Sequence, residues 1–243
     1  MTFRNSYESS TRAEAYSKLD FSGTYYLAFR DLPELISQNV EGRMALDFGC
    51  GAGRSTRFLQ ELGFNAVAVD ISEAMLEKAR EIDPAGDYRR IKQSDLSEFK
   101  TNTFDVVLSA FTFDNIPTLD AKVANFREIM RTMKKDALLV SVVSSPEMYT
   151  HEWVSFSTKE FPENKNAKAG DKVRVQFQTD KSKEDPVVDV FWPDASYREV
   201  FYAAGLEIIK THKPLGKKTD TCKWISETKI PPWVIYLLKK EKK

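Results

Sequence analysis

The chain has 243 residues, of which 42% are hydrophobic and 30% charged, so it is long enough for one globular domain with a packed core. Lysine plus arginine equals aspartate plus glutamate at 36 each, which provides no overall positive field for nucleic acid and favours a small-molecule substrate. Cys50 and Cys222 are far apart, so we expect no metal site, no disulfide framework and a cytoplasmic location. We also expect no signal peptide and no membrane span, because every apolar run is short.

The first forty residues contain two helical patterns rich in aromatic side chains, AEAYSKL and TYYLAFRDLPELIS, with Gly23 between them. We expect residues 1–40 to form a helical cap over one end of the domain. Four tyrosines of this cap either close over a ligand or, as is more frequent, pack in the core. They are Tyr7, Tyr16, Tyr25 and Tyr26.

Residues 44–143 alternate short β-rich runs with helical patterns, which is typical of a parallel sheet with crossover helices. The predicted strands are 44–48, 66–70, 88–92, 105–109 and 137–143. The apolar residues of two predicted helices recur at spacings of three and four. They are Ile71, Met75, Ala79 and Ile82 in the first helix, and Leu119, Val123, Phe126, Met130 and Met133 in the second. Ser72 is the expected N-cap of the first.

Residues 144–193 are too long for a bare loop, so we predict an insertion with its own structure after the fifth strand. Apolar and polar residues alternate on both sides of the turn DKSKEDP, which predicts a hairpin over the edge of the sheet. The apolar positions are Val173, Val175 and Phe177 before the turn, and Val188, Val190 and Trp192 after it. We interpret the insertion as a substrate lid. Residues 194–240 then supply a final helix at 197–204 and two antiparallel strands, which completes a single domain over 1–243.

The stretch MALDFGCGAGRST passes from a predicted strand through Gly49, Gly51 and Gly53 into a predicted helix. Arg54 stands one position after the last of these, so the G-x-G-x-x-G spacing of dinucleotide-binding turns is absent. A backbone without Cβ atoms lets a ligand lie against the main chain, where amides at the helix start face it. Asp70 ends the next strand, where a carboxylate can accept both hydroxyl protons of a ribose.

Three segments, LDFGCGAGR, VAVDISEAMLEKAR and SDL at 94–96, resemble in order and spacing the class I S-adenosylmethionine-dependent methyltransferases of the small-molecule type. The resemblance covers residues 44–140 closely and the last helix and two strands more loosely, whereas the insertion corresponds only in position. It implies an α/β fold: a Rossmann-like, seven-stranded, mostly parallel sheet with an antiparallel last strand and helices on both faces. It also implies S-adenosyl-L-methionine as cofactor and S-adenosyl-L-homocysteine as product.

The resemblance assigns cofactor-binding roles to eleven residues. The first group would surround the methionine end of the cofactor: Asp47, Gly49, Gly51, Gly53, Ser109 and Phe111. The second group would hold the ribose and the adenine: Asp70, Ile71, Met75, Asp95 and Leu96. Without the resemblance the glycines could form a turn that binds nothing, Ile71 and Met75 could be core residues, and Asp95 could cap a helix.

Methyl transfer from a sulfonium is an in-line displacement, so alignment and exclusion of water contribute most, up to roughly 7 to 11 kcal/mol. A base is needed only where the acceptor must lose a proton. We weakly favour His151 in YTHEWVSF, although a surface histidine is an equally good interpretation and His212 looks structural. Asp114 and Asn115 also suggest magnesium, but no third ligand accompanies them. Further aromatic residues could stack on a flat acceptor: Trp153, Phe156, Trp192 and Trp224.

Two alternatives to a methyltransferase remain open at this point. A noncatalytic S-adenosylmethionine-binding module would keep every motif, because the motifs belong to the cofactor site and catalysis adds few recognisable residues to the sequence. A nicotinamide-dependent oxidoreductase would share the turn and Asp70, but it should carry a glycine at position 54. The lack of an N/D-P-P-Y run after the fourth strand disfavours base methylation of nucleic acid, and we expect a monomer or homodimer acting on a small-molecule methyl acceptor.

Overall fold

The computed structural model describes residues 10–178 and 185–241. A seven-stranded sheet forms its centre in the order β3-β2-β1-β4-β5-β10-β9, and β10, the last strand, is antiparallel to both of its neighbours. The strands are β1 (Met44–Phe48), β2 (Asn65–Asp70), β3 (Asp87–Arg90), β4 (Phe104–Ala110), β5 (Met133–Ser144), β9 (Leu206–His212) and β10 (Trp233–Lys240). The predicted fold class is therefore confirmed.

The observed strands lie close to their predicted positions, and β1 has the predicted bounds. The largest difference is in β5, which begins at Met133, four residues before the prediction. The helix that precedes it ends at Thr132, one residue before the end of its apolar pattern. Met133 instead pairs with Phe104 of β4, where the register shifts before Val106, so its apolar side chain is buried by the sheet.

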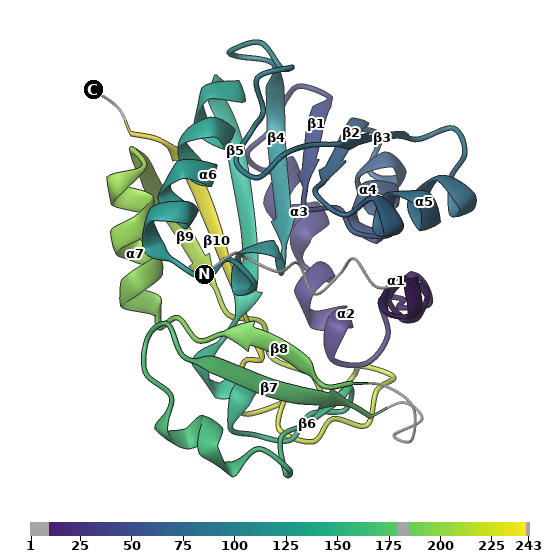
Figure 1. The fold of residues 1–243 in the computed structure, drawn as a ribbon, viewed down its shortest axis with the longest axis vertical. Helices are drawn as coiled ribbons and strands as arrows, with labels where there is room; N and C mark the ends of the chain where they lie inside the picture. The colour runs from purple at the N-terminus through teal and green to yellow at the C-terminus, as the bar shows by residue number, and fades with distance from the viewer. Residues whose placement is uncertain (1–9, 179–184, 242–243) are drawn as a thin grey trace.

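Helices cover both faces of the sheet, as Figure 1 shows. One face packs against α6 (Leu119–Thr132) and α7 (Asp194–Ala203) through buried residues such as Phe126 and Phe201. The other face packs against the remaining helices, which are α2 (Thr24–Phe29), α3 (Leu32–Ser37), α4 (Arg54–Glu61) and α5 (Glu73–Ile82). Across the described residues, no helix combines the length and the apolar composition that a membrane crossing requires.

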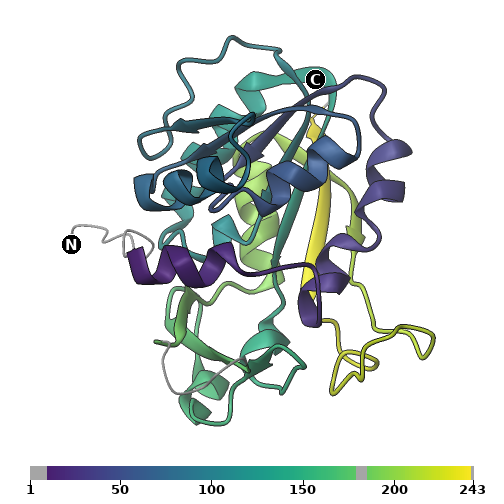
Figure 2. The ribbon, with the colours of Figure 1, turned by 90° about the vertical axis from the view of Figure 1, so that its right-hand side faces the viewer.

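The start of α5 follows the predicted capping. The Ser72 side chain accepts a hydrogen bond from the Met75 amide at 3.4 Å, so the expected N-cap is confirmed. Of the N-terminal cap, α1 (Ser10–Ser17) lies against α5, and Ala13 packs between Ala52 and Met75. Figure 2 shows α1 between the main sheet and the smaller sheet below it.

The insertion forms a three-stranded antiparallel sheet of β6 (Phe156–Ser157), β7 (Lys172–Phe177) and β8 (Val187–Val190). Short 3-10 helices in the described residues lie before the insertion at Thr112–Asp114 and within it at Pro146–Tyr149 and Pro162–Asn166. The predicted hairpin of β7 and β8 is present, but β8 has the opposite phase to the prediction. Val187 and Asp189 are its buried residues, whereas Val188 and Val190 are partly exposed, so a carboxylate occupies an inward position.

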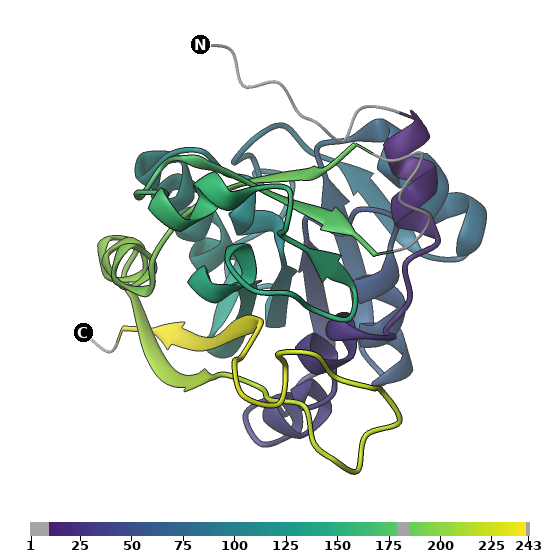
Figure 3. The same ribbon diagram turned by 90° about the horizontal axis from the view of Figure 1, so that it is seen from below.

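A buried glutamate in the connection between β9 and β10 joins three separate segments of the chain. One carboxylate oxygen of Glu227 accepts hydrogen bonds from the Thr24 hydroxyl and the Val154 amide, both at 2.8 Å. The Thr24 carbonyl in turn accepts a hydrogen bond from the Trp233 indole at 2.8 Å. These contacts fix α2, the insertion and β10 relative to one another at the carboxyl end of the sheet, which Figure 3 shows from below.

Candidate functional site

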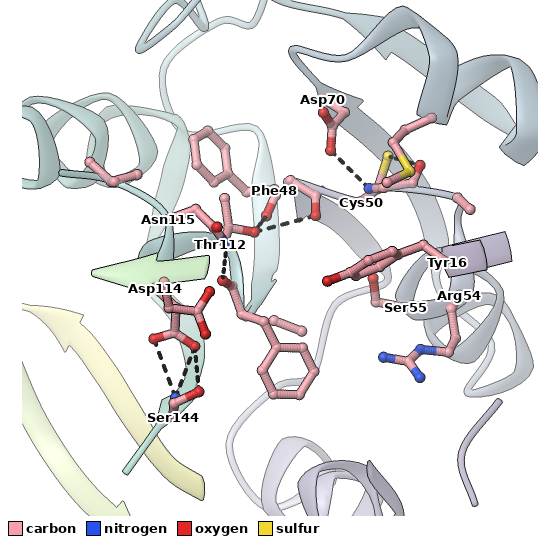
Figure 4. A pocket seen from close by; sticks show the side chains of 18 of the residues that line it. Tyr16, Phe48, Cys50, Arg54, Ser55, Asp70, Thr112, Asp114, Asn115 and Ser144 are labelled. Carbon is pink, nitrogen blue, oxygen red and sulfur yellow. Dashed lines mark hydrogen bonds between the residues drawn. The ribbon is translucent and has the colours of Figure 1, made fainter. Parts of the chain in front are cut away.

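A pocket lies at the carboxyl ends of β1, β2 and β4, and residues of α1, α2 and the smaller sheet also line it. The empty space between its lining residues is about 1490 Å³, a figure that includes space open to solvent. The lining residues come from the glycine turn, the strand ends, the cap and the insertion. Figure 4 shows Asp70, Arg54 and Asp114 on different sides of the pocket.

The glycine turn forms one wall. Gly49 and Gly51 line the pocket with φ of +76° and +52°, values that favour glycine, and an ideal Cβ on Gly51 would meet no atom within 4 Å. Gly53 does not line the pocket; its φ of +80° makes it the left-handed N-cap of α4, and a Cβ there would fall 2.6 Å from the Tyr88 hydroxyl. The turn therefore presents bare backbone to the open space.

Asp47 lies beneath the turn and is fully buried. Its Oδ2 atom accepts hydrogen bonds from the Ser55 hydroxyl at 2.7 Å and the Thr56 hydroxyl at 2.6 Å, which ties β1 to the first turn of α4. Its Oδ1 atom has no hydrogen-bond partner among the described residues. Burial raises the pKa of Asp47 to about 6, although the two hydroxyls partly oppose the shift.

Asp70 lies at the opposite end of the turn and lines the pocket. Its carboxylate accepts hydrogen bonds from the Gly51 and Ser72 amides, each at 2.8 Å, so its orientation is fixed by backbone. Burial raises its pKa, and these amides oppose the shift. Ile71 and Met75 lie beside it on the pocket wall, as the ribose and adenine assignment requires.

The SDL segment is placed differently from the expectation. Gln93 and Ser94 line the pocket, and Ser94 has a φ of +57°, a strained value for a residue other than glycine. Asp95 is exposed and accepts a hydrogen bond from the Ser97 amide at 3.0 Å, while Leu96 is fully buried in the core, and neither lines the pocket. Their adenine roles stay predictions.

The end of β4 supplies a second strained residue. Phe111 lines the pocket at a φ of +65°, and Thr112 beside it donates a hydrogen bond to the Phe48 carbonyl at 3.0 Å. Backbone strain of this kind clusters at functional sites, where surrounding structure holds it in place. Ser109, by contrast, is fully buried and does not line the pocket, and within the described structure its hydroxyl finds no partner.

The far end of the pocket is polar where the chain reaches the insertion. Asp114 accepts hydrogen bonds from the Ser144 amide at 3.0 Å, the Ser144 hydroxyl at 2.9 Å and the Tyr197 hydroxyl at 3.2 Å. Burial raises its pKa, which the hydrogen bonds of Ser144 and the charge of Lys122 oppose. Asp189 of β8 also lines the pocket and accepts a hydrogen bond from the Tyr149 hydroxyl at 3.2 Å.

Aromatic side chains wall the space between these polar ends. Tyr25 stacks on Trp233 with centroids 5.7 Å apart and meets Phe111 and Phe156 edge to face, and all four line the pocket. Tyr16 lines it too, whereas Tyr26 is exposed and Tyr7 lies outside the described residues. An enclosed aromatic chamber suits a flat bound molecule.

The structure does not bring the remaining candidate residues to this pocket. His151 follows the first 3-10 helix of the insertion, where its Nδ1 lies 3.2 Å from the Glu147 carbonyl. His212 is held by Asp31 at 2.8 Å. Trp153, Trp192 and Trp224 also lie outside the lining. No cluster of three His, Cys, Asp or Glu side chains with metal-binding geometry occurs in the described parts of the chain.

Comparison with known proteins agrees with this geometry. The family model described as "Methyltransferase domain" matches residues 46–141, which span β1 to β5. The N-demethylindolmycin N-methyltransferase of Streptomyces griseus is 27% identical over 217 residues, which cover 86% of this chain and 90% of that protein. A solved S-adenosylmethionine-dependent methyltransferase from Clostridium acetobutylicum superimposes with a TM-score of 0.64 over 94% of this chain and 95% of its own, at 14% identity. Residues 46–141 thus match a methyltransferase domain, and the chain is similar over most of its length to S-adenosylmethionine-dependent methyltransferases.

A second curated relative matches about half of the chain. The ubiquinone biosynthesis O-methyltransferase of Methylococcus capsulatus is 29% identical over 140 residues, or 49% of this chain and 58% of that protein. The expected enzyme class is confirmed.

Three features of the methyltransferase pocket fit S-adenosylmethionine. The space over Gly51 is open to a ligand that lies on the main chain. The Asp70 carboxylate is oriented by two amides at the place expected for a ribose. Beneath the turn and outside the pocket lining, Asp47 Oδ1 is a buried acceptor without a partner in the described structure, and such an atom is satisfied when a donor reaches it.

The raised pKa of Asp47 predicts a pH-dependent stability in the methyltransferase. The folded chain holds the Asp47 proton up to about pH 6, while the unfolded chain releases it near the ordinary value of 3.8. Because the folded state then binds more protons, the free energy of unfolding rises as the pH falls from 7 to 5, by about 1 kcal/mol from this group. Chemical denaturation of Asp47→Asn should show a pH dependence smaller by that amount. An identical dependence would contradict the assignment.

Proposed function

We propose that the chain transfers the methyl group of S-adenosylmethionine to a nitrogen or oxygen atom of a small molecule bound in the same pocket. The observation that carries this proposal is the continuous pocket, which runs from Asp70 past the glycine turn into the aromatic chamber. Its lining joins the glycine turn and Asp70 to the aromatic chamber, so a cofactor and an acceptor would lie in one connected space.

For the cofactor, we propose that Asp70 binds the ribose hydroxyls, and that Ile71 and Met75 contact the adenine faces. Asp95 and Leu96 are proposed for the adenine edge through the family resemblance. Around the methionine end we propose the residues of the turn and the end of β4, which are Asp47, Gly49, Gly51, Gly53, Ser109 and Phe111. When bound, S-adenosylmethionine supplies a methyl group that is activated by its positive sulfur.

For the acceptor, we propose the chamber walled by Tyr25, Phe111, Phe156 and Trp233. Its aromatic faces can stack on a flat acceptor and exclude water from the reacting atoms. Asp114 is the better candidate base than His151, because it lines the pocket and burial raises its pKa toward the range in which a carboxyl exchanges protons.

The relative that matches along 90% of its length is an N-methyltransferase by name, which supports a nitrogen acceptor for this chain. For the organisation of the chain, we propose one domain over residues 1–243: a cap at 1–40, a cofactor-binding core at 44–143, a substrate lid at 144–193 and a final segment at 194–240. We further propose a cytoplasmic location, consistent with two unpaired cysteines, and a monomer or homodimer.

The test is the release of S-adenosylhomocysteine from S-adenosylmethionine with separate panels of aromatic amines and phenols. We expect turnover with members of one panel. Asp114→Asn should lower kcat by about a hundredfold while S-adenosylhomocysteine affinity stays unchanged, because a positioned base contributes about that much. A chain that binds the cofactor but methylates no member of either panel would favour the noncatalytic alternative.

A further inference from the structure

The charges around the pocket are unequal in number. Three carboxylates line it, those of Asp70, Asp114 and Asp189, against a single basic side chain among the described residues, Arg54. S-adenosylmethionine carries two positive groups, its sulfonium and its ammonium, and one carboxylate. An anionic group that enters the pocket is therefore repelled by the carboxylates and attracted at one place, the Arg54 guanidinium.

Arg54 has no carboxylate partner in the described structure. Half-buried arginines elsewhere are paired, such as Arg30 with Asp31 at 2.8 Å and Arg131 with Glu128 at 2.9 Å. No carboxylate oxygen of the described residues lies within the 4.0 Å limit of an ion pair with Arg54. Its Nη1 donates a hydrogen bond to the Asp20 carbonyl at 2.6 Å and the guanidinium also interacts with the Tyr25 hydroxyl, which leaves part of its five N–H donors for other groups.

Aromatic rings cover part of the Arg54 guanidinium, while the side chain stays partly exposed. Its central carbon lies 4.3 Å from the Tyr25 ring centroid and 5.5 Å from the centroids of Phe21 and Phe29. This burial lowers the pKa of Arg54, because the charged guanidinium is less stable here than in water. A desolvated cation binds an anion more strongly than an exposed one does, because less water has to be displaced.

The position of Arg54 in the chain adds to this attraction. It is the first residue of the eight-residue helix α4, and the N-cap Gly53 provides no side chain to the free amides of the first turn. The positive end of the helix therefore lies beside the guanidinium, at the edge of the glycine turn. Figure 4 shows the guanidinium across the pocket from Asp114 and Ser144.

We propose that Arg54 is the carboxylate-binding residue of this pocket. The carboxylate belongs either to the methionine end of the cofactor or to an aromatic acceptor stacked in the chamber, since Tyr25 contacts both Arg54 and the rings of that chamber. The inference rests on the proposed function. It assigns a role to Arg54, to which the family resemblance assigns none. It also requires that a molecule bound in the pocket carries a carboxylate.

The test uses Arg54→Met, which keeps an apolar stem against Tyr25, and Arg54→Lys, which keeps the charge without the planar fork. Each protein is titrated calorimetrically with S-adenosylhomocysteine and with S-adenosyl-3-thiopropylamine, which has the same structure without the carboxylate. A third titration adds 3-phenylpropionate, an aromatic carboxylate, to protein saturated with S-adenosylhomocysteine. Thermal unfolding without ligand checks the fold of each variant. If Arg54→Met does not fold, Arg54→Lys serves in its place with the same expected directions.

If the cofactor supplies the carboxylate, Arg54→Met weakens S-adenosylhomocysteine binding at least about tenfold and leaves the affinity for the decarboxylated analogue unchanged. If the acceptor supplies it, cofactor affinity is unchanged and binding of 3-phenylpropionate is lost. Equal losses for both nucleosides, or no change with any probe, would overturn the inference. Failure of the proposed function is distinct, because the wild-type protein would then bind neither nucleoside.

Discussion

Replacement of Asp70 by alanine should weaken S-adenosylmethionine binding by about a hundredfold. Two hydrogen bonds from ribose hydroxyls to a carboxylate contribute roughly 1.5 kcal/mol each, and every 1.4 kcal/mol corresponds to a tenfold change in affinity. The carboxylate is already fixed by the Gly51 and Ser72 amides, so little orienting entropy is lost on binding. Calorimetric titration with S-adenosylmethionine and S-adenosylhomocysteine measures the loss.

A matched control for Asp70 lies one strand away. Asp87 on β3 is paired with Arg89 at 2.7 Å and does not line the pocket, so Asp87→Ala should leave both affinities unchanged. Asp70→Asn separates charge from shape, because its amide can keep one of the two backbone hydrogen bonds. If Asp70→Ala bound the cofactor with wild-type affinity, the ribose assignment would be wrong.

Replacing Gly49 with alanine should mainly lower the stability of the fold, whereas replacing Gly51 with alanine should mainly weaken cofactor binding. At Gly49 the added Cβ would fall on the Thr112 side chain at a φ of +76°, so we expect a loss of about 2 to 4 kcal/mol in the free energy of unfolding. At Gly51 the Cβ meets open space at a φ of +52°, so the loss should be about 1 kcal/mol. That open space is where we place the cofactor, and Gly51→Ala should therefore lower its affinity at least about tenfold.

Chemical denaturation and calorimetry together distinguish the two glycines. Thr112→Ala removes the side chain that the Gly49 substitution would strike, so the double variant Gly49→Ala/Thr112→Ala should regain part of the lost stability. A Gly51→Ala protein with normal cofactor affinity would show that the ligand does not lie against this part of the backbone.

The sequence predicted the core of the fold well because local patterns determine it. The alternation of strand and helix signals located β1 to β4 within a residue or two, and Ser72 was identified as an N-cap from its place before an apolar helical pattern. The glycine turn and Asp70 were also visible in advance, since their spacing follows from the close approach of backbone and ligand. These residues do come together at one wall of the pocket.

The acceptor end depends on contacts between distant segments, which no local pattern reports. The alternation pattern puts Val188 and Val190 on the apolar face of β8, yet the tertiary packing buries Val187 and Asp189 instead. Arg54 stood out only as the residue that breaks a dinucleotide motif. Its aromatic surroundings come from Tyr25, Phe21 and Phe29 of the cap, which are distant from it in the sequence. Strain at Ser94 and Phe111 likewise appears only in the backbone geometry.

The central claim, that the pocket holds an S-adenosyl cofactor against the glycine turn, is tested most directly by parallel calorimetric titrations of the wild-type chain. The ligands are S-adenosylmethionine, S-adenosylhomocysteine and NAD. We expect saturable binding of the first two, one molecule per chain, and no heat of binding with NAD. Binding of NAD, or no binding of either S-adenosyl compound, would contradict the account.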